Sequence, residues 1–291
     1  MRTLPLGPGA PEVTTVGFGG MPLSISGRPD EAVALRTIHT VLDAGVTLLD
    51  TADVYCMDHT DIGHNERLMA RALASWRGDK ARVIVATKGG MTRQGGSWDR
   101  DGSPKHLRAA CEASLKAVGV ECVDLYQFHA PDPRVQFAES VGALADLKKA
   151  GKVRWVGLSN VSVRQIEEAS AIVEVTTVQN RLNPYFREAL TEGVVQYCGK
   201  KGIGFLAYSP VGGGRLNKKL PSHPVLLDIG KKHRASPHAV VIAWVMAQGT
   251  SVIPIPGSRT VEHALDALSA ANLKLTADDL AAIDKAEFSR A

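Results

Sequence analysis

The chain has 291 residues, 44% of them hydrophobic, which is enough apolar material to bury a large core. Its 34 basic and 30 acidic residues leave a net charge of +4, and no basic block of the kind that binds nucleic acid is present. Four widely spaced cysteines without a C-x-x-C pair, and no apolar run of signal-peptide or membrane-spanning length, lead us to expect reduced thiols, a cytoplasmic location and no membrane partner.

Eight short apolar runs rich in Val, Ile and Leu are the predicted strands, and a longer segment with helical periodicity follows each of them. The runs cover residues 15–20, 47–50, 83–88, 123–129, 153–159, 176–180, 204–209 and 251–256. In the first helix, Pro29 and Asp30 suit the first turn and Gly45 suits the C-terminal cap. A later helix has Ser103 as its expected N-cap and closes at Gly119.

Repeated strand and helix units are typical of a parallel sheet covered by helices. An open doubly wound sheet also fits, but eight near-regular units favour an α/β fold of the (β/α)8 TIM barrel type. The turn-rich residues 2–15 are expected to form a short hairpin at the barrel bottom, and extra helices are expected near the C-terminus. No linker or low-complexity tract divides the chain, so one barrel domain over residues 1–291 is predicted.

Ionisable side chains stand at the carboxyl ends of these strands, where the active sites of such barrels lie. Asp50, Lys88 and His129 end the second, third and fourth strands, and Tyr55 follows Asp50 in a loop. A structural role is the default for a single Asp or His at a strand end. An unpaired ammonium at the edge of a core is costly, however, so Lys88 needs a polar partner, and Asp50 is the nearest candidate.

Seven short segments, in order along the chain, resemble the aldo-keto reductase family of nicotinamide-dependent carbonyl reductases. They are LLDTADVY, ATK, LYQFHAPD, VGLSN, VQNRLN, AYSPVGGG and IPIPGSR. The resemblance covers nearly the whole chain, from residue 16 to about residue 267. It implies an NADPH-dependent oxidoreductase that reduces a small aldehyde or ketone to an alcohol.

The same resemblance implies a catalytic role for four residues. Hydride reaches the carbonyl carbon while the oxygen gains negative charge, and Tyr55 then donates the proton that this oxygen needs. A free phenol has a pKa of about 10, and the positive charge of Lys88 is expected to lower it. Asp50 would hold Lys88 in place, and His129 would orient the carbonyl in an oxyanion-type pocket. In the reverse direction Tyr55 would act as the base.

Further residues match family positions that contact the NADP(H) cofactor: three for the nicotinamide carboxamide, one aromatic residue that stacks on the ring, a glycine-rich loop for the pyrophosphate, and two residues for the adenosine 2′-phosphate. In that order they are Ser159, Asn160 and Gln179, then Tyr208, then Ser209, Pro210, Val211 and Gly213, then Ser258 and Arg259. The last two favour NADPH over NADH.

Some positions of the expected site differ from known dinucleotide-binding motifs or from the residues that many relatives have. GFGGMP lacks the G-x-G-x-x-G spacing and predicts a first barrel strand whose backbone approaches the cofactor at Gly19. Many relatives have a Glu-Asn pair at the adenine, and the matching residues are Asp266 and Ala267, so the adenine contact is expected to differ. Leu182 stands where many relatives have tyrosine, a change expected to alter the margin of the site and leave its chemistry intact.

Two other functions remain open. A metal-dependent barrel hydrolase would use Cys56, Asp58, His59, Asp61 and His64, but metal ligands usually converge from several strand ends and these five share one loop, so no metal is predicted. A cofactor-binding sensor or accessory protein on the same fold would bind NADP(H) without turnover, and the retention of all four catalytic residue types argues against it.

The substrate is expected to be set by loops. One of them spans residues 89–102 and contains Trp98, and the long C-terminal loop that encloses substrate in some relatives is expected to be absent, which favours broad carbonyl specificity. TKGGMTRQGG, LYQFHAPDP and GKVRWVGLSN look most like bacterial members for which pyridoxal has been proposed as a substrate. In the polar loop after Tyr55, Asn65 is expected to cap the next helix, with Glu66 favoured near its positive end.

Overall fold

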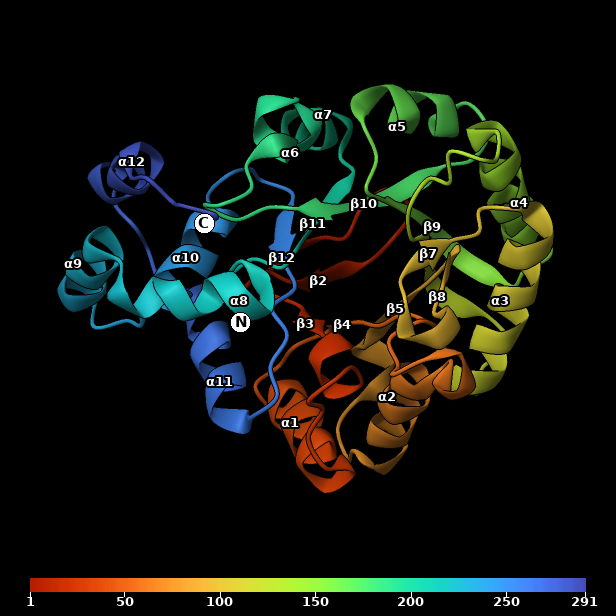
Figure 1. The fold of residues 1–291 in the computed structure, drawn as a ribbon, viewed down its shortest axis with the longest axis horizontal. Coiled ribbons are helices and arrows are strands. Elements are labelled where there is room, and N and C mark those ends of the chain that lie inside the picture. Colours follow the sequence, from red (N-terminus) through yellow and green to blue (C-terminus); the bar gives the residue numbers. More distant parts are fainter.

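Eight parallel strands form the central sheet of the computed structural model, which describes residues 1–291, and helices lie in a ring outside them (Figure 1). In hydrogen-bonding order the strands are β3 (Phe18–Gly19), β4 (Leu48–Asp50), β5 (Ile84–Gly89), β8 (Val123–Phe128), β9 (Val153–Ser159), β10 (Val175–Arg181), β11 (Gly204–Tyr208) and β12 (Val252–Pro254). The N–H groups of Gly17 and Gly19 donate to the carbonyls of Pro254 and Pro256 at 3.0 Å, which closes the sheet into a barrel. The predicted (β/α)8 fold is therefore confirmed.

The outer layer consists of helices that follow the strands. They are α1 (Glu31–Asp43), α2 (His64–Ser75), α3 (Pro104–Val118), α4 (Phe137–Lys149), α5 (Val163–Ser170), α6 (Glu188–Thr191), α7 (Val194–Lys201), α8 (Gly213–Leu216), α9 (Pro224–His233), α10 (Pro237–Met246), α11 (Val261–Ser269) and α12 (Ala277–Lys285). The largest buried cluster lies between the strands and this layer, and it includes Trp244 of α10 and Phe205 of β11. None of these helices has both the length and the apolar character needed to span a membrane.

A short N-terminal hairpin closes one end of the barrel. Its strands are β1 (Thr3–Pro5) and β2 (Glu12–Thr14), as expected from the turn-rich opening. Leu6 packs with side chains of the barrel interior, and Trp155 Nε1 donates to the carbonyl of Gly9 at 2.8 Å. Gly7 adopts φ +149°, and a Cβ there would lie 1.9 Å from the carbonyl oxygen of Thr176. Only glycine lets this turn approach the strand so closely.

Helix boundaries follow the expected signals at most places. Ser103 caps α3 by accepting from the His106 N–H, Gly119 ends that helix at φ +78°, and Gly45 takes φ +95° directly after α1 and its cap. The expected cap of α2 was wrong. This helix begins at His64 after Gly63, which has φ +78°, and Asn65 lies buried within its first turn.

The structure contains two strands in a segment expected to be a loop. These are β6 (Met91–Thr92) and β7 (Asp99–Arg100), an antiparallel pair that extends beyond β5. The hairpin carries Trp98, whose ring lies near Tyr55, at 6.4 Å between centroids. The segment therefore forms a structured wall at the carboxyl ends of the strands.

Candidate active site

Four predicted catalytic residues meet where β4, β5 and β8 end. The Lys88 ammonium donates to Asp50 Oδ1 at 2.6 Å, to the Thr51 carbonyl at 2.8 Å and to the Tyr55 hydroxyl at 3.0 Å. His129 follows β8, and its ring meets that of Tyr55 edge-on at 5.8 Å between centroids. Parallel strands bring their carboxyl ends to one side of the barrel, which is why residues up to 79 positions apart converge here.

Lys88 is completely buried, with 0% of its side chain exposed. Burial works against its charge, but Asp50 and then Tyr55 outweigh burial, and the pKa of Lys88 is raised above its usual value. It is therefore an ammonium at neutral pH, and it donates hydrogen bonds to Asp50, Thr51 and Tyr55. The sequence-based pairing of Lys88 with Asp50 is present in the structure.

Tyr55 differs from the expectation in one respect. Lys88 does act to lower its pKa, but burial acts more strongly, and the pKa of Tyr55 is raised overall. The reason is that Tyr55 is only 8% exposed, so that its phenolate would lose most of its hydration. Tyr55 is consequently a neutral phenol near pH 7, and its proton is present to be donated when a neighbouring atom gains negative charge.

His129 is neutral at physiological pH. Burial lowers its pKa well below the usual value, and the nearby Lys88 charge lowers it further. Its Nδ1 is buried without a hydrogen-bond partner. A neutral imidazole has one N–H, so His129 can donate to a substrate oxygen without supplying a proton of its own.

Two glutamines complete the surroundings of Asp50. Gln179 Nε2 donates to Asp50 Oδ2 at 2.8 Å, and Gln127 Nε2 donates to the same oxygen at 3.2 Å. Sequence reasoning assigned Gln179 to the cofactor and missed Gln127. The available signal was alternation: Gln127 lies two residues before His129 and shares its face of the strand.

Several predicted nicotinamide contacts lie next to His129. Asn160 takes φ +59°, which directs its amide Nδ2 to the His129 carbonyl at 3.0 Å and to Ser159 Oγ at 3.1 Å. The Tyr208 hydroxyl donates to Asn160 Oδ1 at 2.8 Å. The structure thus brings Ser159, Asn160 and Tyr208 together, whereas the amide nitrogen of Gln179 is turned to Asp50.

The predicted pyrophosphate loop begins where β11 ends and continues into α8. Ser209 has φ +49°, and its carbonyl accepts from Asn183 Nδ2 at 2.8 Å. Gly212 and Gly213 also have positive φ. A Cβ at Gly212 would meet the side chains of Leu216 and Tyr185, whereas a Cβ at Gly213 would meet nothing closer than Ser209 Oγ at 3.9 Å. Pro210 and Val211 complete this stretch between the strand and the short helix.

The residues assigned to the adenosine end are only partly brought together. Arg259 donates to the carbonyls of Pro22 and Ser26, at 3.2 and 2.7 Å, and Ser258 beside it is buried. Asp266 instead accepts from the hydroxyl of Ser236, the N-cap of α10, at 2.7 Å.

Gly19 has a structural reason to be glycine. A Cβ at this position would lie 2.8 Å from the carbonyl oxygen of Ile255, in the neighbouring strand segment that closes the barrel. Gly19 therefore makes a close backbone approach to another strand. Its contact with the cofactor stays a prediction.

The polar loop after Tyr55 does not form a metal site. Asp61 pairs with Arg28 at 2.6 Å, His64 Nδ1 lies 2.8 Å from Ser24 Oγ, and the Cys56 thiol faces backbone carbonyls. The other two candidates, Asp58 and His59, belong to a surface turn. No group of three His, Cys, Asp or Glu side chains is arranged to hold a metal ion.

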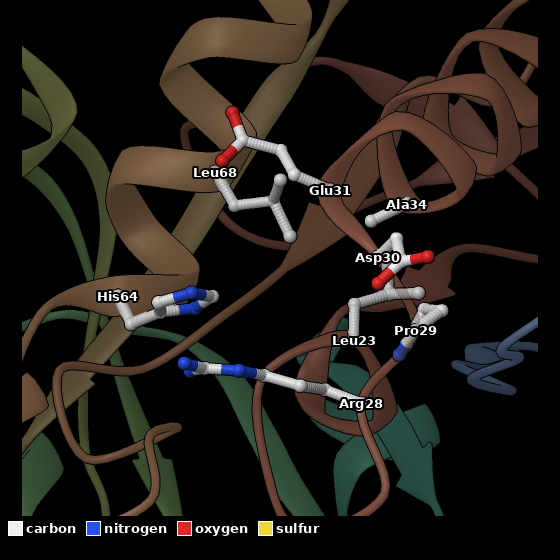
Figure 2. Close-up of a pocket in the computed structure, with 8 residues that line it drawn as sticks. All are labelled: Leu23, Arg28, Pro29, Asp30, Glu31, Ala34, His64 and Leu68. Carbon is white, nitrogen blue, oxygen red and sulfur yellow. The ribbon is translucent and has the colours of Figure 1, made fainter.

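A cavity of about 330 Å³ lies between the first turns of α1 and α2 (Figure 2). The side chains of Arg28 and His64 lie on one side of it, the Asp30 carboxylate lies on the opposite side, and the Glu31 carboxylate lies above, near Leu68. Its remaining lining residues are Leu23, Pro29, Ala34 and Leu68. None of the predicted catalytic or cofactor residues lines it, so it is separate from the site at the strand ends.

The side wall formed by the β6 and β7 hairpin depends on Arg93, which sequence reasoning also missed. Its guanidinium lies over the Trp98 ring, 4.0 Å from the centroid, and donates to the carbonyls of Cys56 and Met57 at 3.1 and 2.8 Å. Arg93 thus joins the hairpin to the loop that carries Tyr55. Trp98 is 46% exposed, so part of its ring is available to a ligand.

Comparison with known proteins gives a consistent result. The model of the aldo/keto reductase family matches residues 15–287. A probable aldo-keto reductase 1 of Glycine max is 34% identical over 94% of this chain and 86% of its own length, and an uncharacterized oxidoreductase of Schizosaccharomyces pombe is 33% identical with the same coverages. The glycerol dehydrogenase of Gluconobacter oxydans is similar in structure, with a TM-score of 0.84 and 27% identity over 97% of this chain and 94% of that one.

The holo form of an aldo-keto reductase from Bacillus halodurans has a TM-score of 0.80 and 25% identity, and covers 98% of this chain and 96% of its own. The family match spans all eight strands of the barrel. The four-residue cluster at the strand ends lies within the matched range. The chain is an enzyme that belongs to the aldo/keto reductase family of oxidoreductases.

Proposed function

We propose that the protein reduces a small aldehyde or ketone to an alcohol with NADPH, and that Tyr55 is the proton donor. The observation that carries this proposal is the Tyr55 hydroxyl, 3.0 Å from the fully buried ammonium of Lys88. A neutral phenol beside a fixed positive charge can give up its proton as negative charge grows on a bound oxygen.

The four side chains have distinct roles in this reaction. Tyr55 holds the proton, and His129 donates its one N–H to the carbonyl oxygen, so the developing charge meets two donors. Lys88 stabilises the phenolate that remains after proton transfer. Asp50 keeps the ammonium at its place, because it forms the shortest of the three bonds to Lys88 Nζ. After the product leaves, Tyr55 regains a proton from solvent.

Features of this structure fit a nicotinamide dinucleotide. When bound, it would supply the hydride. Asn160 and Ser159 lie at the rim beside His129, and none of the hydrogen bonds of Gln179 uses Oε1, which leaves an acceptor for a carboxamide. The Gly212 N–H already donates to the Ser209 carbonyl, whereas the Gly213 backbone has no atom of another side chain close to it and can offer its N–H group to a pyrophosphate. Tyr208 would pack on the ring.

A preference for NADPH rests on Arg259. Its guanidinium contacts only backbone carbonyls and forms no ion pair, so its positive charge is not neutralised by a carboxylate. A planar guanidinium suits a phosphate dianion. Asp266 accepts from the Ser236 hydroxyl through Oδ2, so Oδ1 is the oxygen left for an adenine amino group.

The test is a fluorescence titration with NADPH and with NADH, followed by turnover of a panel of aldehydes and ketones that includes pyridoxal. We expect tighter binding of NADPH and carbonyl-dependent oxidation of it, unchanged by EDTA. Binding of NADPH without turnover of any carbonyl would instead support a sensor or accessory protein. A stoichiometric catalytic metal found by metal analysis of the purified protein would support the hydrolase-type alternative and contradict the proposal.

A further inference from the structure

The two oxygens of Asp50 have different partners. Oδ1 accepts from Lys88 at 2.6 Å, which leads to Tyr55, whereas Oδ2 accepts from Gln179 at 2.8 Å and from Gln127 at 3.2 Å. Gln179 Nε2 also lies 3.3 Å from Gln127 Oε1. Asp50, Gln127 and Gln179 therefore form a closed triangle inside the barrel, and each of them is at most 2% exposed.

The barrel makes room for Gln127 at a specific place. A Cβ at position 157 of the neighbouring strand would lie 2.7 Å from Gln127 Cγ, so Gly157 leaves the space that the glutamine occupies. A buried amide is costly unless its groups are hydrogen-bonded, and a leucine would fill this position without that requirement. The contacts of Gln127 with Asp50 and Gln179 are what compensate for burying it.

We propose that Gln127 is a positioning residue for the reduction: it holds Asp50 and Gln179 in a fixed relation, and so links the carboxamide end of the cofactor site to the proton donor. The inference rests on the proposed function of Tyr55 and Gln179. Without the Gln127 amide, Asp50 loses one donor and Gln179 loses the acceptor that, with Asp50, fixes its orientation. Both side chains then gain rotational freedom.

The link has an electrostatic consequence at Tyr55. An amide N–H points the positive end of its dipole at Asp50 and offsets part of its negative charge. Removing that dipole strengthens the field of Asp50, which favours the protonated phenol. The titratable groups that face Tyr55 from the packed elements are Lys88 on β5, Asp50 on β4, Tyr208 on β11 and His129 after β8.

The experiment measures kcat/KM against pH and the Kd of NADPH in Gln127→Leu and Gln127→Glu, with the carbonyl that the wild type reduces best. Loss of one hydrogen bond in Gln127→Leu should move the basic limb up by about 0.5 to 1 pH unit and weaken NADPH binding about 3- to 10-fold. Gln127→Glu should move the limb further, because it adds a carboxyl group beside Asp50. Gln248→Leu is the matched control, since the one side-chain hydrogen bond of Gln248 goes to the Trp244 carbonyl on α10.

Two results would overturn the inference: a basic limb and Kd equal to those of the wild type, or a loss of rate in which the limb does not move, as expected of packing alone. Gln127→Met replaces the leucine variant if that one does not fold, and the same shift is expected. A wild-type protein that turned over no carbonyl would overturn the proposed function and this inference together. An active wild type with an unaltered Gln127→Leu would overturn the inference alone.

Discussion

Replacing Lys88 by methionine removes a charge without changing the length of the side chain much. The variant deletes three hydrogen bonds, to Asp50, Thr51 and Tyr55, and leaves Asp50 in the barrel with only amide donors. Removing one partner of a buried ion pair costs about 3–5 kcal/mol of unfolding free energy. Because Gln127 and Gln179 still hold Asp50, we expect the lower end, about 3 kcal/mol.

A double-mutant cycle separates the interaction free energy of Lys88 and Asp50 from the contacts that each makes with other residues. Lys88→Met and Asp50→Asn, each alone, leave one charge uncompensated, whereas the double variant leaves none. The double variant should therefore be more stable than the sum of the single effects predicts, by about 2 kcal/mol. Urea unfolding, followed by circular dichroism, measures all four free energies.

The same variant tests the chemistry. Without the ammonium, the phenolate of Tyr55 loses the group that stabilises it, and carbonyl-dependent NADPH oxidation should fall by about 100-fold or more. Three results together would refute the reasoning. They are a loss of less than about 1 kcal/mol of unfolding free energy in Lys88→Met, additive free energies in the cycle, and turnover within about tenfold of the wild type.

Three further predictions concern other parts of the molecule. Arg259→Ala should raise the Kd of NADPH by about tenfold or more and leave that of NADH nearly unchanged, as measured by fluorescence titration. Asp279 is buried, and although burial opposes its charge, hydrogen bonds from Lys232 and His233 hold its pKa below the usual range. Asp279→Ala should therefore lower the free energy of unfolding near pH 7 by about 1–3 kcal/mol. Urea unfolding at several pH values should show this difference from wild type shrinking as the pH falls below about 4. Gly7→Ala should cost about 2 kcal/mol or more in urea unfolding, because its Cβ would meet backbone.

The sequence was sufficient to predict the barrel and the meeting of Asp50, Lys88 and His129 on one side of it, because both follow from strand ends. Once Asp50, Lys88 and His129 were placed at the ends of parallel strands, the geometry of such barrels brought them together. The length of each strand was less predictable: the first run spans residues 15–20, but only Phe18–Gly19 pair as a strand. Strand boundaries depend on hydrogen bonds to neighbours, which periodicity does not show.

Residues whose roles depend on tertiary partners were harder to predict. Asn65 resembles a helix cap, yet it accepts from Thr51 Oγ1 at 2.6 Å and donates to the Gly20 carbonyl at 2.8 Å, and so it ties α2 to two strand ends. Gln127 is one of three polar residues in the run at 123–129, and its partner Asp50 lies 77 positions away. The raised pKa of Tyr55 reflects how completely the folded chain excludes water, which no motif specifies.

The hairpin that carries Trp98 was also hard to predict from the sequence. Its strands are two residues each, and the glycine-rich sequence between β5 and α3 predicts a loop. The Arg93 guanidinium that holds Trp98 interacts with carbonyls of a different loop. Such an arrangement is fixed by where the two loops meet at the barrel mouth.

The central claim is that Tyr55 donates the proton, and Tyr55→Phe tests it most directly, since it removes one oxygen. NADPH binding and carbonyl-dependent NADPH oxidation are measured side by side in the wild type, in Tyr55→Phe and in Tyr197→Phe, a tyrosine of α7 outside the site. We expect an unchanged Kd in all three and a loss of turnover of about 100-fold or more in Tyr55→Phe alone. Turnover of Tyr55→Phe within about tenfold of the wild type, at equal Kd, would contradict the claim.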